Sequence, residues 1–397
     1  MENYPFDLDV LLSPTALIFI AVLIAGVRSS CGPGLTLALA LLKSGLYFVY
    51  YGFLFDGTFT FLDDWTYLEG VEHLLDQEAG LFELFGSEFL FLVANGDHVV
   101  YYLYNALAMS WFGRGYYAPV ALNIVLTVVI ARLGVQLLVS EGLISQRQRS
   151  LFFAFIVLHP DILAWSTVMN GKDILVFLLH VLLLMSVAWF LRGQRWSALV
   201  LAAASSFVLL FLRFYVPILF GVALVTAVVV TSPQRGIKLV LPALFLLGIA
   251  LSRFGIEGIE YAIHAVREDF VNPLYGFFRF VLTPIPFNTE EAYAFLDLPA
   301  ILHWLLLPAV VLGIWKLYHR NTAFSHFLIV YTILFVGLYA VYGELQGPRH
   351  RVQLDFAWAT FQFLGLSLML CTRRLSKLPN PGDSNAAVRR ISAISRK

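Results

Sequence analysis

Long apolar segments alternate with short polar turns along most of this 397-residue chain. A helix needs about 17 to 25 apolar residues to cross the hydrocarbon core of a bilayer, which is roughly 30 Å thick. About eleven segments approach that length, so the pattern predicts an all-α polytopic membrane protein. The expected spans are 11–27, 35–55, 117–140, 150–166, 174–191, 198–212, 216–231, 239–252, 298–315, 324–342 and 352–371.

Two further apolar segments are too short to span. Val99 to Phe112 (VVYYLYNALAMSWF) holds fourteen residues, and its aromatic side chains are typical of headgroup depth. We therefore expect an interfacial helix there, since a crossing would move the preceding loop to the other side of the membrane. Leu81 to Val93 is expected to form a second membrane-surface helix, with its carboxylates toward water.

Composition supports a membrane protein, because 59% of the residues are hydrophobic and only 13% are charged. The 26 basic and 26 acidic residues give no net charge, which excludes a nucleic-acid binder by bulk charge. Two cysteines, Cys31 and Cys371, cannot build a disulfide framework or a metal cluster. The first apolar run follows an acidic start (MENYPFDLD), so we expect a retained span rather than a signal peptide.

The basic residues gather in alternate loops, which predicts the orientation. These loops contain Arg28; Arg147 and Arg149; Arg192 and Arg195; Arg235 and Lys238; Lys316 and Arg320; and the tail 373–397. Loops rich in Lys and Arg stay in the cytoplasm. We therefore expect a cytoplasmic C-terminus and long external loops at 56–116 and 253–297, in a bacterial cytoplasmic membrane.

These expectations divide the chain into five parts. They are 1–34, an N-terminal span and cytoplasmic turn; 35–252, a transmembrane module with the external loop 56–116; 253–297, a second external loop; 298–371, the C-terminal spans; and 372–397, a basic cytoplasmic tail.

Two adjacent carboxylates, Asp63 and Asp64 in FLDDWTYLEG, follow the span 35–55 directly. They could cap the helix that starts near Trp65, because an acidic side chain is favourable at a helix N-terminus. Alternatively, one of them could deprotonate a hydroxyl at the membrane surface, since a neighbouring carboxylate raises a pKa toward the working range. Both roles can hold, one for each residue.

Lys172 and Asp173 lie in a second external turn, WSTVMNGKDILVF. The ordinary interpretation is an Asn-Gly turn followed by an acid that opens the next helix. Because this turn is expected on the same side as Asp63 and Asp64, the pair could also bind an acceptor, orient the base or help to hold a divalent ion. Asp161, after Pro160, could face the same space.

Arg349, His350 and Arg351 lie in a third external turn, GELQGPRHRVQLDF. They could anchor the turn at the membrane interface, but cations on the external side run against the positive-inside bias. Paired guanidinium groups at this depth suit a phosphate or diphosphate. Within the spans, Lys43 and Arg132 are expected to reach a membrane surface by snorkelling.

Three segments together resemble the GT-C superfamily of integral-membrane glycosyltransferases, which includes protein O-mannosyltransferases, aminoarabinose transferases and oligosaccharyltransferases. FLDDWTYLEGVEHLL is similar to the acidic first external loop, and DHVVYYLYNALAMSWFGRGYYAPVALNIVL to the surface helix that follows it. LHPDILAWSTVMNGKDILVFLL is similar to the segment with the second acidic motif. Their order and the late Arg-His-Arg turn also agree with that family.

The resemblance implies transfer of a sugar from a polyprenyl-phosphate or polyprenyl-diphosphate donor to a hydroxyl acceptor on the external face, with inversion. It implies Asp63 or Asp64 as the base, Lys172 and Asp173 at the acceptor, and Arg349, His350 and Arg351 at the donor phosphate. A divalent cation is a candidate cofactor, with no ligand set assigned. Because no large soluble domain follows the spans, we expect a lipid or glycan acceptor rather than a folded protein.

Three other functions stay open at this stage. An O-antigen-type polymerase or ligase would depend on external arginines but little on the Asp pair. A transporter or flippase for lipid-linked sugars would favour charges at mid-span and an inverted repeat. A structural assembly partner would tolerate the loss of all these charges.

Overall fold

The computed structural model of the chain describes residues 4–76, 81–84, 87–94, 98–231, 264, 267–287, 291–343 and 347–375. Every regular element within these ranges is a helix, and a single β-bridge joins Phe270 to Tyr342. The expected all-α class is therefore confirmed for this part of the chain.

Within the described residues, six helical segments are long and apolar enough to cross a membrane. They are α1 (Leu8–Arg28), α2 with the π-helical turn η1 (Pro33–Leu54), α7 (Tyr117–Ser140), α10 (Asp173–Leu191), η3 with α16 (Tyr293–Arg320) and α17 (Ala323–Val341). The pair formed by η2 and α8 (Gln146–Val157) and α9 (Pro160–Val168) could be a seventh, bent by 45°. The chain is thus an integral membrane protein.

The expected eleven spans are not confirmed. The helices α11 (Arg195–Leu210) and α12 (Tyr215–Thr231) are apolar but short, and the expected span 239–252 lies outside the described residues. The expected span 150–166 is divided because Pro160 occupies the first turn of α9, where a missing N–H ends the ladder of the preceding helix. The expected span 352–371 becomes the 3₁₀ turn η5 (Val352–Leu354) and α19 (Asp355–Leu375).

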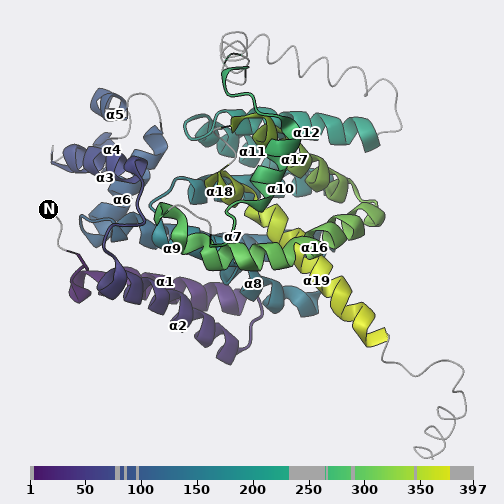
Figure 1. Cartoon of the computed structure of the whole chain (residues 1–397), viewed down its shortest axis with the longest axis horizontal. Helices are drawn as coiled ribbons and strands as arrows, with labels where there is room; N and C mark the ends of the chain where they lie inside the picture. The colour runs from purple at the N-terminus through teal and green to yellow at the C-terminus, as the bar shows by residue number, and fades with distance from the viewer. Residues whose placement is uncertain are drawn as a thin grey trace, which may run out of the picture.

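The helices α7 and α10 form the centre of the bundle (Figure 1). α7 packs against α1, α8, α9 and α10, while α10 also packs against α11. In the most apolar stretch of each helix, 67% of the residues are buried in α10 and 61% in α7, compared with 33% in α1. Exposed leucines of α1 and α2, such as Leu12 and Leu41, therefore form the lipid-facing surface.

Two glycines let α16 and α19 approach at backbone distance. A Cβ on Gly313 would stand 1.9 Å from the carbonyl oxygen of Phe361, and one on Gly365 would stand 1.9 Å from that of Ala309. Small residues allow such close packing between helices in a membrane, where van der Waals contact replaces the hydrophobic effect.

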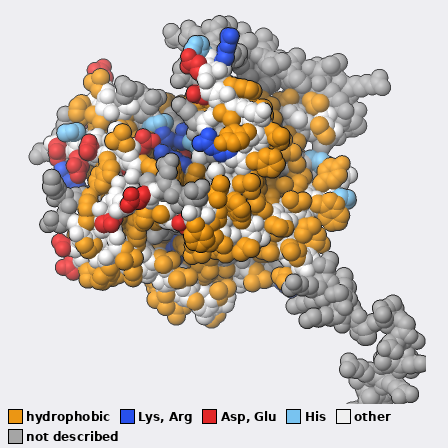
Figure 2. Space-filling view, viewed as in Figure 1, with side chains coloured by type: hydrophobic (Ala, Val, Ile, Leu, Met, Phe, Trp, Pro, Cys, Tyr) orange, Lys and Arg blue, Asp and Glu red, His pale blue; other side chains and the backbone are white. Residues whose placement is uncertain are grey.

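Four helices outside the spans form a separate group at one end of the bundle (Figure 1). They are α3 (Leu62–Leu75), α4 (Leu81–Leu84), α5 (Glu88–Val93) and α6 (Val99–Phe112). The bounds of α6 are those expected, whereas the single surface helix expected at Leu81 to Val93 is wrong, since two short helices occur there. Figure 2 shows acidic side chains gathered over this end, beside a broad apolar surface.

One basic residue of the spans is placed differently from the expectation. Lys43 of α2 is 1% exposed, so it does not snorkel to a surface. Its Nζ lies 3.4 Å from the Ser166 hydroxyl and 3.5 Å from the Val157 carbonyl. These contacts face α8 and α9, so the bent pair packs against the buried end of Lys43.

Candidate functional site

The two adjacent aspartates of α3 have different environments. α3 begins at Leu62, and the Asp64 side chain accepts a hydrogen bond from the backbone N–H of Phe61, the residue before the helix, at 3.2 Å. Asp64 also accepts one from the Tyr116 hydroxyl at 2.8 Å and is fully buried. The Asp63 side chain is 54% exposed. Asp64 is therefore a capping residue, while Asp63 is accessible to a ligand.

Burial also changes the protonation of Asp64. Desolvation raises its pKa to about 7, although the charge of Arg349 and the hydrogen bond from Tyr116 oppose the shift. One oxygen of the carboxylate, Oδ1, is buried without a hydrogen-bond partner among the described residues. Asp64 thus changes charge near neutral pH while remaining out of contact with solvent.

Arg349 joins the first acidic motif to the second. It lies on the short helix α18 (Pro348–Arg351). Its Nη1 is 3.1 Å from Asp63 Oδ2, and its Nε is 2.6 Å from Asp173 Oδ2. These residues come from three segments far apart in sequence, so the fold brings together one member of each predicted motif.

Asp173 has two further partners. Arg213, in the turn between α11 and α12, places Nη2 3.2 Å from Asp173 Oδ1, and the Gln353 amide donates to the same oxygen at 2.5 Å. Sequence reasoning missed Arg213, although a basic residue between the expected spans 198–212 and 216–231 was the available signal. A fully buried carboxylate thereby receives two guanidinium groups.

Lys172 lies beside this cluster and is 3% exposed. Its Nζ donates to the Tyr67 hydroxyl at 2.9 Å and contacts His98 Nε2. Burial, with the nearby charge of Arg213, lowers the pKa of Lys172 to about 7, whereas Asp173 raises it. The lysine therefore changes charge in the same pH range as Asp64.

Hydrogen bonds from α6 and α7 fix the turn that precedes Lys172. Asn170 donates its backbone N–H to the Tyr116 hydroxyl at 3.0 Å, and its side chain contacts Tyr101 at 2.7 Å and Asn105 at 2.9 Å. Tyr116 also holds Asp64, so one phenol connects the first acidic motif to the second. Such a network orients its polar groups before any ligand arrives.

The Arg-His-Arg turn is divided between two sites. Arg351 is 1% exposed and points to Asp161, with Nη2 3.4 Å from Oδ2, and to the Thr283 carbonyl. Burial, with the charge of Arg213, lowers the pKa of His350 to about 3, so this histidine is neutral at pH 7. Of the three residues, only Arg349 brings a positive charge to Asp63 and Asp173.

A different group of side chains could hold a divalent cation. His159, Asp161 and Asp355 each offer one ligand atom, and these atoms lie within 4.8 Å of one another. All three are buried, and His159 Nδ1, Asp161 Oδ1 and both oxygens of Asp355 have no hydrogen-bond partner among the described residues. Imidazole and carboxylate donors fit such an ion. Asp63 and Asp173, in contrast, are bridged by a guanidinium group.

The cluster around Arg349 combines a reachable carboxylate with adjacent cations. Asp63 can accept a proton from a hydroxyl, while Arg213, Arg349 and Lys172 can stabilise an anion. Arg349 Nη2 and Arg213 Nε have no hydrogen-bond partner among the described residues, although both atoms are buried. No protein-family model, curated protein or solved structure matches the chain.

Proposed function

We propose that the chain is a glycosyltransferase of the GT-C type. It moves a sugar from a polyprenyl-phosphate or polyprenyl-diphosphate donor to a hydroxyl of a lipid or glycan. The observation that carries the proposal is the bridge from Asp63 through Arg349 to Asp173. A general base needs a negative charge, and phosphate recognition needs a positive charge within a few ångströms of it. Asp63 and Arg349 provide these two charges.

In the proposed reaction, the acceptor oxygen attacks the anomeric carbon while the bond from that carbon to the phosphate oxygen breaks. Asp63 takes the hydroxyl proton, because it is the exposed member of the pair. The phosphate leaves with an additional negative charge, which Arg349, Arg213 and Lys172 stabilise. Direct displacement inverts the anomeric configuration.

Asp64 acts as a positioning residue in this proposal. It is buried, so it cannot touch an acceptor, but its hydrogen bonds to Phe61 and Tyr116 fix the first turn of α3. That turn carries Asp63. Loss of Asp64 would therefore reduce transfer through geometry rather than through proton removal.

We also propose the expected topology of about eleven crossings in a bacterial cytoplasmic membrane. α11, α12, α19 and the segment 239–252 would complete the six or seven segments that meet the length and hydropathy requirement. The count of basic residues in alternate loops supports an external site and a cytoplasmic C-terminus.

The test is a transfer assay on the full chain in membranes, with a panel of polyprenyl-phosphate and polyprenyl-diphosphate sugars. Loss of a general base lowers turnover by about 10² to 10⁴, so Asp63→Asn should fall by that factor. Asp76→Asn is the matched control, because it removes an exposed acid from the end of the same helix. Arg349→Gln should raise the donor concentration needed for half-maximal rate.

The alternatives give different results in the same assay. An O-antigen-type polymerase or ligase would depend on Arg349 but tolerate Asp63→Asn. A transporter or an assembly partner would show no transfer with any donor. Wild-type turnover in Asp63→Asn would reject the proposed base.

A further inference from the structure

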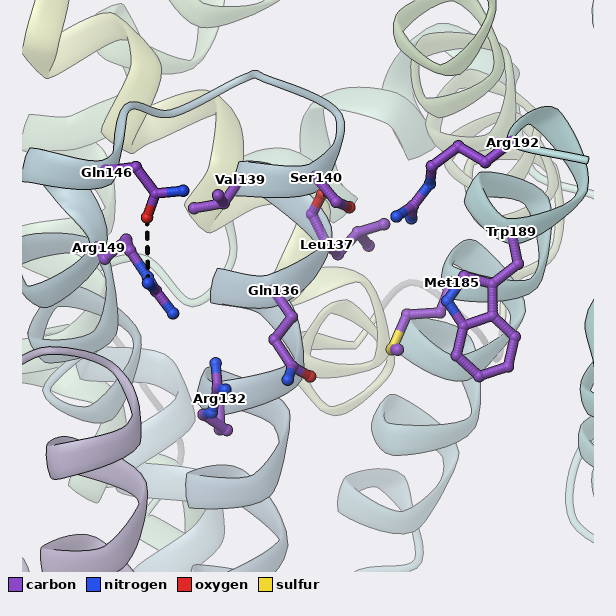
Figure 3. Close-up of a pocket in the computed structure, with 10 residues that line it drawn as sticks. All are labelled: Arg132, Gln136, Leu137, Val139, Ser140, Gln146, Arg149, Met185, Trp189 and Arg192. Carbon is purple, nitrogen blue, oxygen red and sulfur yellow. Dashed lines mark hydrogen bonds between the residues drawn. The ribbon is translucent and has the colours of Figure 1, made fainter. Parts of the chain in front are cut away.

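A cavity of about 380 Å³ lies where the ends of α7 and α10 meet the start of α8 (Figure 3). Arg192 follows the last residue of α10, whereas Asp173 is its first residue. The 19 residues of α10 rise by about 1.5 Å each, so the cavity lies about 28 Å from Asp173 along the helix. It is therefore a second location, at the opposite end of the bundle from the candidate site.

Three arginines line this cavity. Figure 3 shows the side chains of Arg132, Arg149 and Arg192, from α7, α8 and the end of α10, directed toward the same space. Arg192 lies 3.3 Å from Glu141, and Arg149 donates to Gln146 at 3.0 Å. Glu141 thus pairs with Arg192 alone of the three, and it is not among the residues that line the cavity.

Among the described residues, no carboxylate neutralises the charge of Arg132 or of Arg149. Within the described ranges, no carboxylate lies within 4.0 Å of Arg132 or Arg149. Arg132 Nη1 and Arg149 Nε are buried atoms without a hydrogen-bond partner in the same ranges. Uncompensated charges that are partly removed from water are unfavourable unless an anion joins them.

The lining indicates the chemical class of that anion. Guanidinium groups match the oxygens of a phosphate in planar pairs. Leu137, Met185 and Trp189 add apolar walls beside them. Trp189 is typical of the headgroup region of a membrane, and basic residues near a membrane surface attract anionic lipids.

We propose that Arg132, Arg149 and Arg192 form a binding site for the phosphate of an anionic phospholipid headgroup. The phosphate pairs with Arg132 and Arg149, while the apolar walls contact the first part of the lipid. This site is independent of the proposed transfer reaction. A free phosphate ion offers the same oxygens, so the experiment compares the two sources.

The experiment measures binding to the full chain purified in a neutral detergent. Native mass spectrometry is used to titrate dioleoyl phosphatidylglycerol and, in parallel, dioleoyl phosphatidylcholine. Binding of inorganic phosphate is measured as the change in melting temperature when its concentration is raised. We expect the anionic lipid to bind about tenfold more tightly than the zwitterionic one, as expected for charge-assisted hydrogen bonds.

The variants compare arginines inside and outside the cavity. Arg132→Gln with Arg149→Gln should weaken binding of the anionic lipid by about tenfold or more, because two charge-assisted contacts are lost. Arg147→Gln is the matched control, since it removes an exposed charge from the same loop without touching the cavity. If the double variant does not fold, Arg192→Gln carries the test, because its side chain is 39% exposed.

The outcomes separate the interpretations. Loss of lipid binding in the cavity variants alone, with no response to inorganic phosphate, supports the headgroup site. An equal response to inorganic phosphate that is lost in the same variants supports a phosphate site with a soluble source. Unchanged binding of both probes in the cavity variants, or an equal loss in Arg147→Gln, overturns the proposal.

Discussion

Replacement of Arg349 by Met tests the bridge between the two acidic motifs without reference to any reaction. Met has a similar volume but no charge, so the change removes the contacts to Asp173 at 2.6 Å and to Asp63 at 3.1 Å. The two carboxylates differ in exposure, since 3% of the Asp173 side chain and 54% of the Asp63 side chain are accessible. The loss should therefore come almost entirely from Asp173.

The structure sets the expected size of the effect. Removal of one partner from a buried ion pair costs about 3–5 kcal/mol, because the other charge stays buried. Arg213 and Gln353 continue to contact Asp173, so we expect the lower end, about 3 kcal/mol. The exposed contact to Asp63 contributes about 0–1 kcal/mol. Asp63→Asn is therefore the matched control and should change the stability little.

The assay is reversible unfolding of the purified protein in mixed micelles with increasing sodium dodecyl sulfate, monitored by tryptophan fluorescence. The free energy of unfolding is compared for Arg349→Met, Asp173→Asn and the double variant. Coupled partners give a double variant that is less destabilised than the sum of the single changes. If Arg349→Met costs no more than Asp63→Asn, or if the single effects add, the buried bridge is refuted.

Three other predictions concern stability. Burial raises the pKa of Asp64 from 3.8 to about 7. The contribution of Asp64 to the free energy of unfolding is therefore fully present below pH 3.8 and is lost as the pH rises through about 7. Asp64→Asn should remove this loss from the pH profile of the melting temperature, and parallel profiles of the variant and the wild type would contradict the prediction. A Cβ on Gly365 would stand 1.9 Å from a carbonyl oxygen of α16, so Gly365→Ala should cost about 1–3 kcal/mol in the micelle assay. Gly337→Ala, which has open space, is its control, and equal losses would argue against the close contact. Lys43 is buried, and no carboxylate lies within 4.0 Å of it among the described residues. Lys43→Met should therefore raise the free energy of unfolding by about 1–3 kcal/mol. A decrease would show that the ammonium group is stabilising.

The strongest hydrophobic patterns allowed the clearest predictions. The expected segment 117–140 coincides with α7, and the interfacial helix Val99 to Phe112 coincides with α6. Both segments are predominantly apolar, and Gly113 and Glu141 follow their last residues, so local sequence determines where each helix lies. The interruption at Pro160 was harder to predict, because proline can either bend a membrane helix or end it.

The partners within the candidate site depend on geometry that sequence spacing does not supply. Successive residues of a helix are separated by about 100°, so Arg349 and Arg351 project to nearly opposite sides of α18. This explains why Arg349 meets Asp173 while Arg351 meets Asp161. The same rotation separates exposed Asp63 from buried Asp64. Proximity in sequence therefore predicted which turns contribute to the candidate site, but not which residue of each turn takes part in it.

The order of synthesis has a consequence for the residues around Asp173. Arg213 follows Asp173 by 40 residues, whereas Arg349 follows it by 176. At about 5–20 residues per second, Arg349 is made about 10–35 s after Asp173. For most of that interval, Arg213 is the one of these two guanidinium partners that has already been made. A ribosome-bound chain that stops before Arg349 should therefore contain the acidic turns but not the bridge, which makes the bridge a late step of assembly in the membrane.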